Sequence, residues 1–342
     1  MRAAVMRHSQ LVVDTIPDPT PLEGEVVVKT LACGICGSDL HALKHADKMV
    51  EAARESGAPF TLDVTRDVVM GHEFCAEVVA FGPNSSAAVK TGDRVVSMPL
   101  IFRNGAMHGV GYSNDVPGGY GEYMVLSTGL VLPVPNGLST QHAALTEPMA
   151  VGVHAVAKAR LDTYDAPLVI GCGPVGLAVI AALKLRGCAP IVAADFSPMR
   201  RALAERMGAH VVVDPAQRRA IETFSEATSM RPAVIFECVG VPGLLRQIMG
   251  EAPPQARVVV VGVCMDDDVI RPMVGINKEL AVQFVLGYTP DEFAQTLQAI
   301  AEGQIDVAPL ITGRVGLDAV PAAFETLGKP DAHAKILVEP WG

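Results

Sequence analysis

The stretch Val169-Ile170-Gly171-Cys172-Gly173-Pro174-Val175-Gly176 decides the fold of the second half of the chain. It joins an apolar run typical of a strand to a run rich in alanine and leucine that is typical of a helix. Its glycines permit a tight turn, close approach of the backbone to a pyrophosphate, and close packing of helix on strand. The helix N-terminus offers free N–H groups and a partial positive charge to phosphates. A glycine-rich turn without a ligand is the alternative for such a motif taken alone.

Asp195 supplies the second part of a dinucleotide-binding pattern. It ends the next predicted strand, nineteen residues after Gly176. A carboxylate at this place hydrogen-bonds the hydroxyls of the adenosine ribose and would repel a 2′-phosphate. The sequence therefore predicts NAD in preference to NADP, although Arg200 and Arg201 keep NADP open.

From residue 168 onward, predicted strands alternate with predicted helices, which indicates a parallel, doubly wound sheet. The predicted strands are 168–171, 191–195, 211–214, 234–238, 257–263 and 280–286, and the predicted helices are 175–186, 198–207, 219–225 and 291–302. Up to about residue 135, short β-branched runs alternate with turns, which favours an antiparallel, β-rich, barrel-like domain. Within and just after this part we expect a strand over 68–82, a loop over 105–121, and helices over 49–56 and 140–158. The fold class is therefore α/β with two domains. We expect the β-like tail to complete the first domain, which gives 1–150 with 290–342, and 151–289.

The composition indicates a globular protein, and 342 residues are enough for two cores. A net charge of -10 argues against a nucleic-acid partner, which would favour a basic face. The longest uncharged run, 166–183, has the length of a membrane span but is interrupted by glycine and proline. The N-terminus lacks the apolar length of a secretory signal, so we expect a cytoplasmic protein without a membrane partner. The seven cysteines are then free thiols or metal ligands.

A second motif, Cys33-Gly34-Ile35-Cys36-Gly37-Ser38-Asp39-Leu40-His41, is followed by Gly71-His72-Glu73. Cysteine, histidine and carboxylate are the side chains that bind Zn²⁺ at catalytic sites. The pair Cys33 and Cys36 could be half of a four-cysteine structural zinc site, but the sequence contains no second Cys-x-x-Cys. Ordinary packing is the alternative for each residue alone. The argument for a metal rests on the combination with a cofactor domain and with Glu147-Pro148, just before that domain.

The sequence resembles the zinc-dependent medium-chain dehydrogenases over nearly its whole length. The resemblance rests on Gly34–His41, Gly71-His72-Glu73, Gly92-Asp93-Arg94-Val95, Gly118-Gly119-Tyr120-Gly121-Glu122-Tyr123, Glu147–Ala155, the glycine loop and Glu237-Cys238-Val239-Gly240. The Glu147-Pro148 form is most similar to the sorbitol and threonine dehydrogenase branch, in which glutamate replaces a cysteine ligand of liver-type alcohol dehydrogenases. The resemblance implies a GroES-like catalytic domain and a Rossmann cofactor domain.

The resemblance also implies roles for single residues. Cys36 and His72 would bind one catalytic Zn²⁺, with Glu73 or Glu147 as the remaining protein ligand. Asp39 would orient His72, as metal-bound histidines normally require, and Ser38 and His41 match the proton-relay positions. Val175 would face the pyrophosphate and Arg200 the adenosine, while the last two strands would line the nicotinamide. The implied cofactor-binding residues are Gly171, Gly173, Pro174, Val175, Gly176, Asp195, Arg200, Val239, Val261, Gly262, Val263, Val285, Leu286 and Gly287.

The sequence departs from these relatives in three places. Many relatives hold a structural zinc with four cysteines after the Gly-Asp-Arg-Val strand, but 95–123 contains no cysteine, so we expect no structural zinc. Residues 46–67 look like an insertion, placed either at the substrate entrance or on the surface. Polyol-oxidising relatives carry arginine and tyrosine where Gly287 and Leu43 stand. Without those contacts the hydroxyls of a polyol would stay unpaired, so we expect a less hydroxylated alcohol.

The expected reaction moves hydride between a small-molecule alcohol and NAD and gives a ketone or an aldehyde. The proton would leave through Ser38, the nicotinamide ribose and His41. The alternatives are a polyol or amino-alcohol dehydrogenase, a zinc-free quinone or enone reductase, and a non-catalytic binding protein on the same scaffold. The apolar segment 280–286 is a candidate edge strand that relatives pair across a dimer, so we expect a homodimer or homotetramer.

Overall fold

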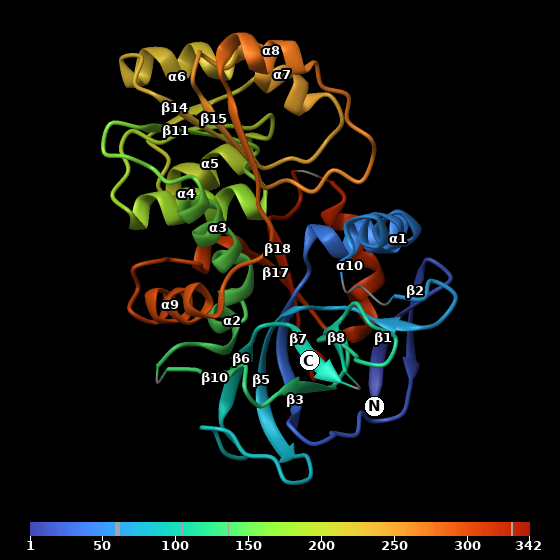
Figure 1. Ribbon diagram of the computed structural model, residues 1–342. Helices are drawn as coiled ribbons and strands as arrows, with labels where there is room; N and C mark the ends of the chain where they lie inside the picture. Colours follow the sequence, from blue (N-terminus) through green and yellow to red (C-terminus); the bar gives the residue numbers. More distant parts are fainter. Residues whose placement is uncertain (59–61, 104, 136, 330) are drawn as a thin grey trace. The chain divides into compact units, whose positions relative to one another are not determined.

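A computed structural model describes residues 1–58, 62–103, 105–135, 137–329 and 331–342. The chain forms two compact units, both seen in Figure 1. The first unit comprises Met1–Glu147, Phe293–Ala301 and Ile311–Gly342, and the second comprises Pro148–Glu292 and Glu302–Leu310. Two boundaries between the units, after Glu147 and after Glu292, lie within three residues of the expected ones at 150 and 290. The segment 302–310 differs, because its short helix η1 (Ala308–Leu310) packs on α5 (Pro198–Met207) of the second unit.

Antiparallel pairing of short strands builds the first unit. Its strands are β1 (Arg2–Arg7), β2 (Gln10–Thr15), β3 (Glu25–Gly34), β4 (Val68–Val69), β5 (Glu73–Phe81), β6 (Arg94–Ser97), β7 (Leu100–Arg103), β8 (Ala106–Gly109), β9 (Tyr123–Ser127), β10 (Val131–Pro133), β17 (Ile311–Val315) and β18 (Lys335–Val338). One sheet has the order β2-β1-β4, and a larger one has the order β10-β6-β5-β3-β18-β17, with β9 also paired to β3. The β-branched strand β3 is therefore the centre of the unit, and it holds the C-terminal strand β18 beside the first metal-ligand motif.

Three local expectations for the first unit were wrong. The single strand expected over 68–82 is two strands, because Gly71 has φ +102, a conformation that glycine adopts readily, and the chain turns there. The loop expected over 105–121 contains β8, which pairs with β7. The helix expected from Met49 is α1 (Gly37–Ser56), which begins directly after Cys36 and kinks at His45.

The positions of the prolines explain where the helices near the boundary between the two units begin. The helix expected over 140–158 is two helices, α2 (Thr140–Ala143) and α3 (Thr146–Lys158). Pro148 lies in the first turn of α3, where the missing N–H has no intrahelical partner to lose. The interruption between α2 and α3 therefore lies before Thr146. Two further helices, α9 (Pro290–Ala301) and α10 (Val320–Leu327), complete this part of the chain together with the 3₁₀ turn η2 (Leu317–Ala319).

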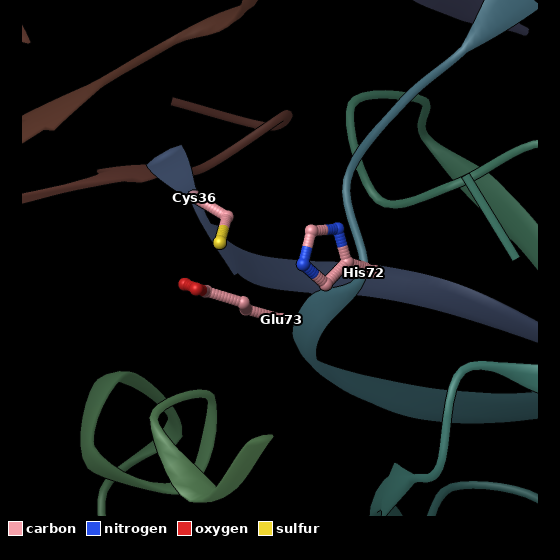
Figure 2. A group of neighbouring side chains, drawn as sticks. All are labelled: Cys36, His72 and Glu73. Atoms are coloured by element: carbon pink, nitrogen blue, oxygen red, sulfur yellow. The ribbon is translucent and has the colours of Figure 1, made fainter. Parts of the chain in front are cut away.

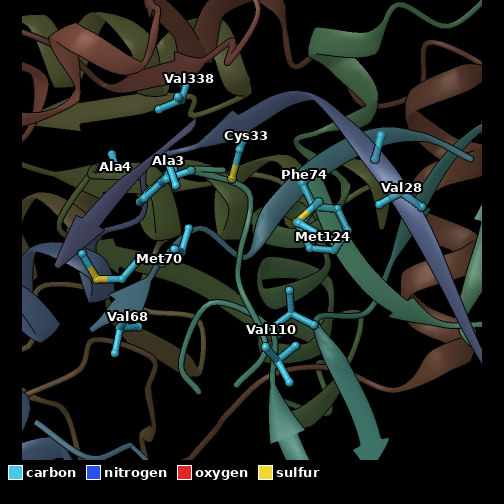
Figure 3. Close-up of a cluster of buried hydrophobic side chains, with 14 of the residues drawn as sticks. Ala3, Ala4, Val28, Cys33, Val68, Met70, Phe74, Val110, Met124 and Val338 are labelled. Carbon is cyan, nitrogen blue, oxygen red and sulfur yellow. The ribbon is translucent and has the colours of Figure 1, made fainter. Parts of the chain in front are cut away.

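Buried apolar side chains from β1, β3, β5, β9 and β18 fill the core of the first unit, as Figure 3 shows. Cys33 lies in this core with no exposed surface. Burial raises the pKa of its thiol well above the ordinary value, with further contributions from Asp39 and Glu73. Cys33 is therefore a packing residue and not half of a Cys-x-x-Cys metal site.

The second unit contains a parallel sheet of order β13-β12-β11-β14-β15-β16. Its strands and helices are β11 (Ala166–Ile170), α4 (Pro174–Leu185), β12 (Val192–Ala194), α5, β13 (Val211–Val213), α6 (Ala220–Thr228), β14 (Ala233–Glu237), α7 (Leu244–Glu251), β15 (Arg257–Val260), α8 (Pro272–Lys278) and β16 (Ala281–Phe284). Counted in chain order, the strands lie 3-2-1-4-5-6, the arrangement of a dinucleotide-binding doubly wound sheet. The predicted α/β fold class is confirmed. β16 forms one edge of the sheet and all four of its residues are exposed.

Among the described residues, no helix combines the length and the apolarity needed to cross a membrane.

Candidate metal centre and cofactor site

Cys36 is placed by the start of α1. It is the N-cap residue of the helix, and its backbone N–H donates to the carboxylate of Asp39, the third residue of the helix, at 3.0 Å. A carboxylate in the first turn satisfies a free N–H group and interacts favourably with the helix dipole. The junction of β3 and α1 thus fixes the direction of the Cys36 side chain.

His72 and Glu73 enter from the turn at Gly71 and the start of β5. Glu73 lies opposite Gly34 in the β3–β5 pairing, and a Cβ at Gly34 would overlap the Glu73 carboxylate. The ligand atoms of Cys36, His72 and Glu73 all lie within 4.8 Å of one another. Figure 2 shows the three side chains converging, with one ring nitrogen of His72 toward Cys36 and the other pointing away.

The donor set of this group fits a zinc ion, since thiolate, imidazole and carboxylate are the protein ligands that Zn²⁺ prefers. Nδ1 of His72 lies 3.4 Å from Oδ1 of Asp39, which is long for a hydrogen bond. Nδ1 is buried and has no hydrogen-bond partner of regular geometry in the part of the chain that the structure describes. Asp39 therefore faces one nitrogen of the ring, and the other remains available for a metal.

The charges of the site depend on Asp39. Burial raises its pKa, but His72 and the hydrogen bonds from Tyr120 and Cys36 outweigh burial and hold the pKa below the ordinary value. Burial lowers the pKa of His72, but Asp39 and Cys36 outweigh it and raise that pKa well above the ordinary value. A metal that binds here therefore displaces a proton.

Lys335 is a partner of the site that the sequence did not indicate. Its Nζ lies 2.7 Å from each carboxylate oxygen of Glu73 and donates to the backbone oxygen of Ile35 at 3.1 Å. Both charged side chains are buried. Burial lowers the pKa of Lys335, but Glu73 and Cys36 outweigh burial and raise it. The run Lys-Ile-Leu-Val predicts a buried strand, but a lysine is rarely buried unless it is paired, and the sequence does not name its partner.

Glu147, the other predicted ligand, lies in the first turn of α3. It is not part of the close group that the described residues form with Cys36, His72 and Glu73. Its charge contributes to the raised pKa of Lys335, so it acts in the same electrostatic environment. The structure thus brings three of the four predicted ligands together and leaves Glu147 outside that group.

Ser38 and His41 lie one turn apart on the same face of α1. The Ser38 hydroxyl is 2.9 Å from the Tyr112 hydroxyl. His41 is partly buried; burial lowers its pKa, and the nearby His45 and Lys44 lower it further. A histidine with a lowered pKa is neutral near pH 7 and can accept a proton.

Tyr112 and Tyr120 are site residues that sequence reasoning missed. Their hydroxyls lie 2.9 and 2.6 Å from the two oxygens of Asp39. The backbone of Gly119 and Tyr120 donates to the oxygens of Gly71 and Met70, so this segment runs directly beside the His72 turn. Tyr120 belongs to a quoted family motif, and its two preceding glycines are the signal that a close backbone approach occurs there.

The predicted glycine loop joins β11 to α4. Gly171 has φ +92, and a Cβ at Gly176 would overlap the backbone oxygen of Gly171. Gly173 is the N-cap residue of α4 and Pro174 is its first residue, a position that proline favours. Gly173, Pro174 and Val175 are partly exposed, so the first turn of α4 is accessible to a ligand. This tight cradle fits the pyrophosphate of a dinucleotide.

Asp195 and Arg200 flank this loop. Asp195 directly follows β12, and its carboxylate accepts hydrogen bonds from the backbone N–H groups of Cys172 (2.7 Å) and Ser197 (2.8 Å). Nη1 of Arg200 lies 3.9 Å from the position that a Cβ on Gly173 would occupy. Its Nε is buried without a hydrogen-bond partner among the described residues. The loop therefore has an acidic and a basic neighbour.

The other predicted cofactor residues follow the carboxyl ends of three strands, where ligands of doubly wound sheets bind. Val239 follows β14, residues 261–263 follow β15, and residues 285–287 follow β16. Val239 and Val263 are about half exposed, and Leu286 is 88% exposed. Their contact with a cofactor stays a prediction.

Comparisons with known proteins identify the family. Residues 22–136 match the alcohol dehydrogenase GroES-like domain, and residues 174–302 match the zinc-binding dehydrogenase domain. The chain is 35% identical to the (R,R)-butanediol dehydrogenase of Bacillus subtilis (strain 168) over 340 residues, with 96% of each protein covered. The chain belongs to the zinc-dependent medium-chain dehydrogenase family. As a medium-chain dehydrogenase of this type, it is an oxidoreductase that acts on alcohols with zinc and a nicotinamide cofactor.

Further relatives agree with this assignment. A crystal structure of the 2R,3R-butanediol dehydrogenase from Bacillus subtilis superposes with a TM-score of 0.84 at 32% identity, covering 99% of both chains. The sorbitol dehydrogenase of Bacillus subtilis (strain 168) is 28% identical over 357 residues, with 99% of this chain and 97% of that protein covered. A zinc-binding dehydrogenase from Sinorhizobium meliloti 1021 bound to NADP gives a TM-score of 0.84 at 26% identity, with 99% of both chains covered. The family predicted from the sequence is confirmed.

Proposed function

We propose that this medium-chain dehydrogenase oxidises a secondary alcohol with few hydroxyl groups, such as a short vicinal diol, to a ketone with NAD⁺. The observation that carries the proposal is the group of Cys36, His72 and Glu73 within 4.8 Å, with Asp39 behind His72. Zn²⁺ bound there would supply a Lewis acid that lowers the pKa of an alcohol hydroxyl. The butanediol relative supports a diol as substrate.

Two positions support a substrate with few hydroxyl groups. Leu43 packs against the apolar core of the first unit, and Gly287 has no side chain to offer. A polyol would leave its additional hydroxyls without partners at both places, and unpaired buried hydroxyls reduce the rate strongly.

For the metal we propose Cys36 and His72 as constant ligands, with Glu73 and Glu147 as the two carboxylates that alternate as the third protein ligand. Lys335 engages both oxygens of Glu73, which competes with metal binding by that carboxylate. Glu73 would then be an exchange ligand that binds when Glu147 is displaced. We propose a single zinc per chain, because 95–123 has no cysteine to hold a second one.

The chain's own residues would move the proton. Ser38 would accept the proton of the substrate hydroxyl and release its own hydrogen toward the nicotinamide ribose, and His41, neutral near pH 7, would pass a proton to solvent. Asp39 orients the ring of His72 so that one nitrogen faces the metal. Hydride transfer itself is the chemistry of the nicotinamide, for which the protein supplies distance and orientation.

We propose NAD as the cofactor. Asp195 follows the strand after the glycine loop, where a carboxylate repels a 2′-phosphate, and two backbone N–H groups donate to it. Arg200 offers a positive charge beside the same loop, so NADP is the alternative that the assay must compare.

We also propose a homodimer or homotetramer that forms through β16. This strand lies at the sheet edge with Val282, Phe284 and the following Leu286 exposed, and a long apolar edge is a ready template for pairing. None of the seven cysteines forms a disulfide, which supports a cytoplasmic location.

The test is a screen of purified protein with NAD⁺ or NADP⁺ and primary, secondary, vicinal-diol and polyhydroxy alcohols, together with zinc analysis. We expect oxidation of a secondary alcohol or diol with NAD⁺, and Cys36→Ser should lower zinc content and activity together. Cys188→Ser, a partly exposed thiol on the second unit, is the matched control. Normal zinc and turnover in Cys36→Ser contradict the assignment. Reduction of quinones or enones without alcohol oxidation, or no turnover of any substrate, favours one of the other two classes.

A further inference from the structure

The directions of two hydrogen bonds at Tyr112 can be assigned. The Tyr112 hydroxyl lies 2.9 Å from Oγ of Ser38 and 2.9 Å from Oδ1 of Asp39. A phenol has one hydrogen to donate, and an ionised carboxylate only accepts. Asp39 accepts from the Cys36 backbone and the Tyr120 hydroxyl through its other oxygen. The hydrogen of Tyr112 therefore goes to Asp39, and the hydrogen of Ser38 goes to Tyr112.

This chain of hydrogen bonds has a consequence for Ser38. Its hydrogen is directed to Tyr112, so its lone pairs are free for a donor on the other side. We propose that Tyr112 is a positioning residue that sets the Ser38 hydroxyl to accept the proton of the substrate alcohol. The inference rests on the proposed role of Ser38 in the reaction. Ser38 stays neutral only if it releases its own hydrogen toward His41 as it accepts the substrate proton, which needs one rotation of its hydroxyl away from Tyr112.

Tyr112 is held in place by its own segment. Its ring lies 5.1 Å, centroid to centroid, from the ring of His72, and its backbone N–H donates to the oxygen of Gly109 at 3.1 Å. The segment that carries Tyr112 falls within 95–123, where relatives with a structural zinc place four cysteines and this chain has none. Hydrogen bonds and an ion pair from another part of the chain anchor this segment.

The anchor comes from residues 62–67, part of the stretch expected to be an insertion. The Asn114 side chain accepts from the backbone N–H of Asp63 (2.8 Å) and donates to its backbone oxygen (3.0 Å). Arg66 forms an ion pair with Asp115 at 2.7 Å. Two residues after Tyr112 the chain is thus fixed to this stretch, which limits the positions open to the Tyr112 hydroxyl.

The test uses Tyr112→Phe, Ser38→Ala and the double variant. Phenylalanine keeps the ring beside His72 and removes only the hydroxyl. Tyr123→Phe is the matched control, because Tyr123 lies on β9 and packs edge-on against Trp341. Two quantities are measured: the rate at which a chelator removes zinc in the absence of cofactor and substrate, and kcat and KM for NAD⁺-dependent alcohol oxidation.

We expect Tyr112→Phe to release zinc several-fold faster, because Asp39 loses one hydrogen-bond donor. This effect should be smaller than the ~10–100-fold loss of metal affinity that follows when a direct partner of a metal-bound histidine is removed. Ser38→Ala should not change zinc release. Tyr112→Phe should lower kcat about tenfold with KM unchanged, well below the ~10²–10⁴ of a lost acid–base group. In the Ser38→Ala background, Tyr112→Phe should cause no further decrease in kcat, because the two residues act as one unit.

Three outcomes overturn the proposal. Unchanged zinc release in Tyr112→Phe shows that the Tyr112 hydrogen does not go to Asp39 and reverses the direction of the bonds. Equal kcat losses from Tyr112→Phe in both backgrounds show that Tyr112 does not act through Ser38, and no loss at all shows that it has no role. Absence of any alcohol oxidation in the unmodified enzyme refutes the proposed function instead, while zinc release still tests the bond direction. A fluorotyrosine at position 112 is a stronger donor, should slow zinc release, and serves if the phenylalanine variant does not fold.

Discussion

Lys335 reaches Glu73 from a strand 262 residues further along the chain. Both side chains are buried, and each satisfies the other at 2.7 Å. A buried ion pair of this kind costs desolvation energy on both sides, so its presence beside Cys36 indicates a role in fixing the Glu73 carboxylate rather than a gain in stability.

Removal of one partner of this pair should be strongly destabilising. Lys335→Met leaves Glu73 as an unpaired buried charge, so we expect the free energy of unfolding to fall by about 3–5 kcal/mol. Urea denaturation measures the change. Lys335→Arg, which keeps the charge, should lose much less, and the double variant Lys335→Met, Glu73→Gln should recover most of the loss. A Lys335→Met protein within about 1 kcal/mol of the original would contradict the pairing.

His41 should determine the acid side of the pH profile. Its pKa lies below the ordinary value of 6.5, first because of burial and then because of His45 and Lys44. As the pH falls through this lowered pKa, the ring becomes protonated and can no longer accept a proton. The decrease in kcat should therefore occur at pH values below 6.5. His41→Gln should lower kcat and abolish this step, and added imidazole should restore part of the rate. His45→Gln, the control, should keep the step but move it toward pH 6.5, because His45 no longer lowers the pKa of His41. An unchanged acid step in His41→Gln would exclude the relay role.

At the scale of elements, the β11–α4 turn depends on close backbone packing. Gly176→Ala would force a methyl group into the carbonyl oxygen of Gly171 and displace α4 from the sheet. We expect a loss of about 1–3 kcal/mol in unfolding free energy, as for overpacked sites, and weaker NAD binding in calorimetry. Gly250→Ala on α7, where a Cβ meets no atom within 4 Å, is the control and should be neutral or slightly stabilising. Undiminished NAD binding in Gly176→Ala would show that the turn tolerates a side chain.

The parts of the fold that were predicted correctly are those with local patterns. β11, α4 and β12 follow from an apolar run, three glycines and a carboxylate within thirty residues, and their observed bounds agree with the prediction to within a few residues. The start of α1 was missed, because Gly37 and Ser38 are weak helix formers by propensity. The carboxylate of Asp39, bound to the Cys36 N–H, determines the start instead.

The candidate site divides in the same way. Cys36, His72 and Glu73 were predicted because their residue types suit a metal and the family resemblance makes them ligands, and the structure brings them together. The partners Tyr112 and Lys335 were missed, because they meet Asp39 and Glu73 across 73 and 262 residues. Pairings at such separations depend on sheet register, which residue types alone do not specify.

At the scale of the whole molecule, the second unit exposes a row of apolar side chains along β16 and α8. Phe284 is 65% exposed and Ile276 is 68% exposed, and Val282, Leu286 and Met273 are exposed as well. Exposed apolar side chains on an open strand edge support the proposed assembly with another copy of the chain.

Phe284→Asp should therefore convert the proposed homodimer or homotetramer to smaller species, because a charge on the edge strand opposes edge-to-edge pairing. Sedimentation velocity measures the change. Met230→Asp is the control, since Met230 is 82% exposed but lies away from β16, on the loop after α6. A monomeric unmodified protein, or an unchanged oligomer in Phe284→Asp, would contradict assembly through this edge.

The pairing of β18 with β3 has a consequence for biosynthesis. Lys335 contacts the Ile35 carbonyl across 300 residues, so the two ends of this contact leave the ribosome roughly 15–60 s apart at about 5–20 residues per second. During that interval the nascent chain already contains Cys36, His72 and Glu73, but not the lysine that engages the Glu73 carboxylate. Contacts of such high sequence separation form late. The three proposed ligand side chains therefore exist first beside an unfinished sheet, and Lys335 reaches the Glu73 carboxylate only when β18 docks, after translation has passed residue 335.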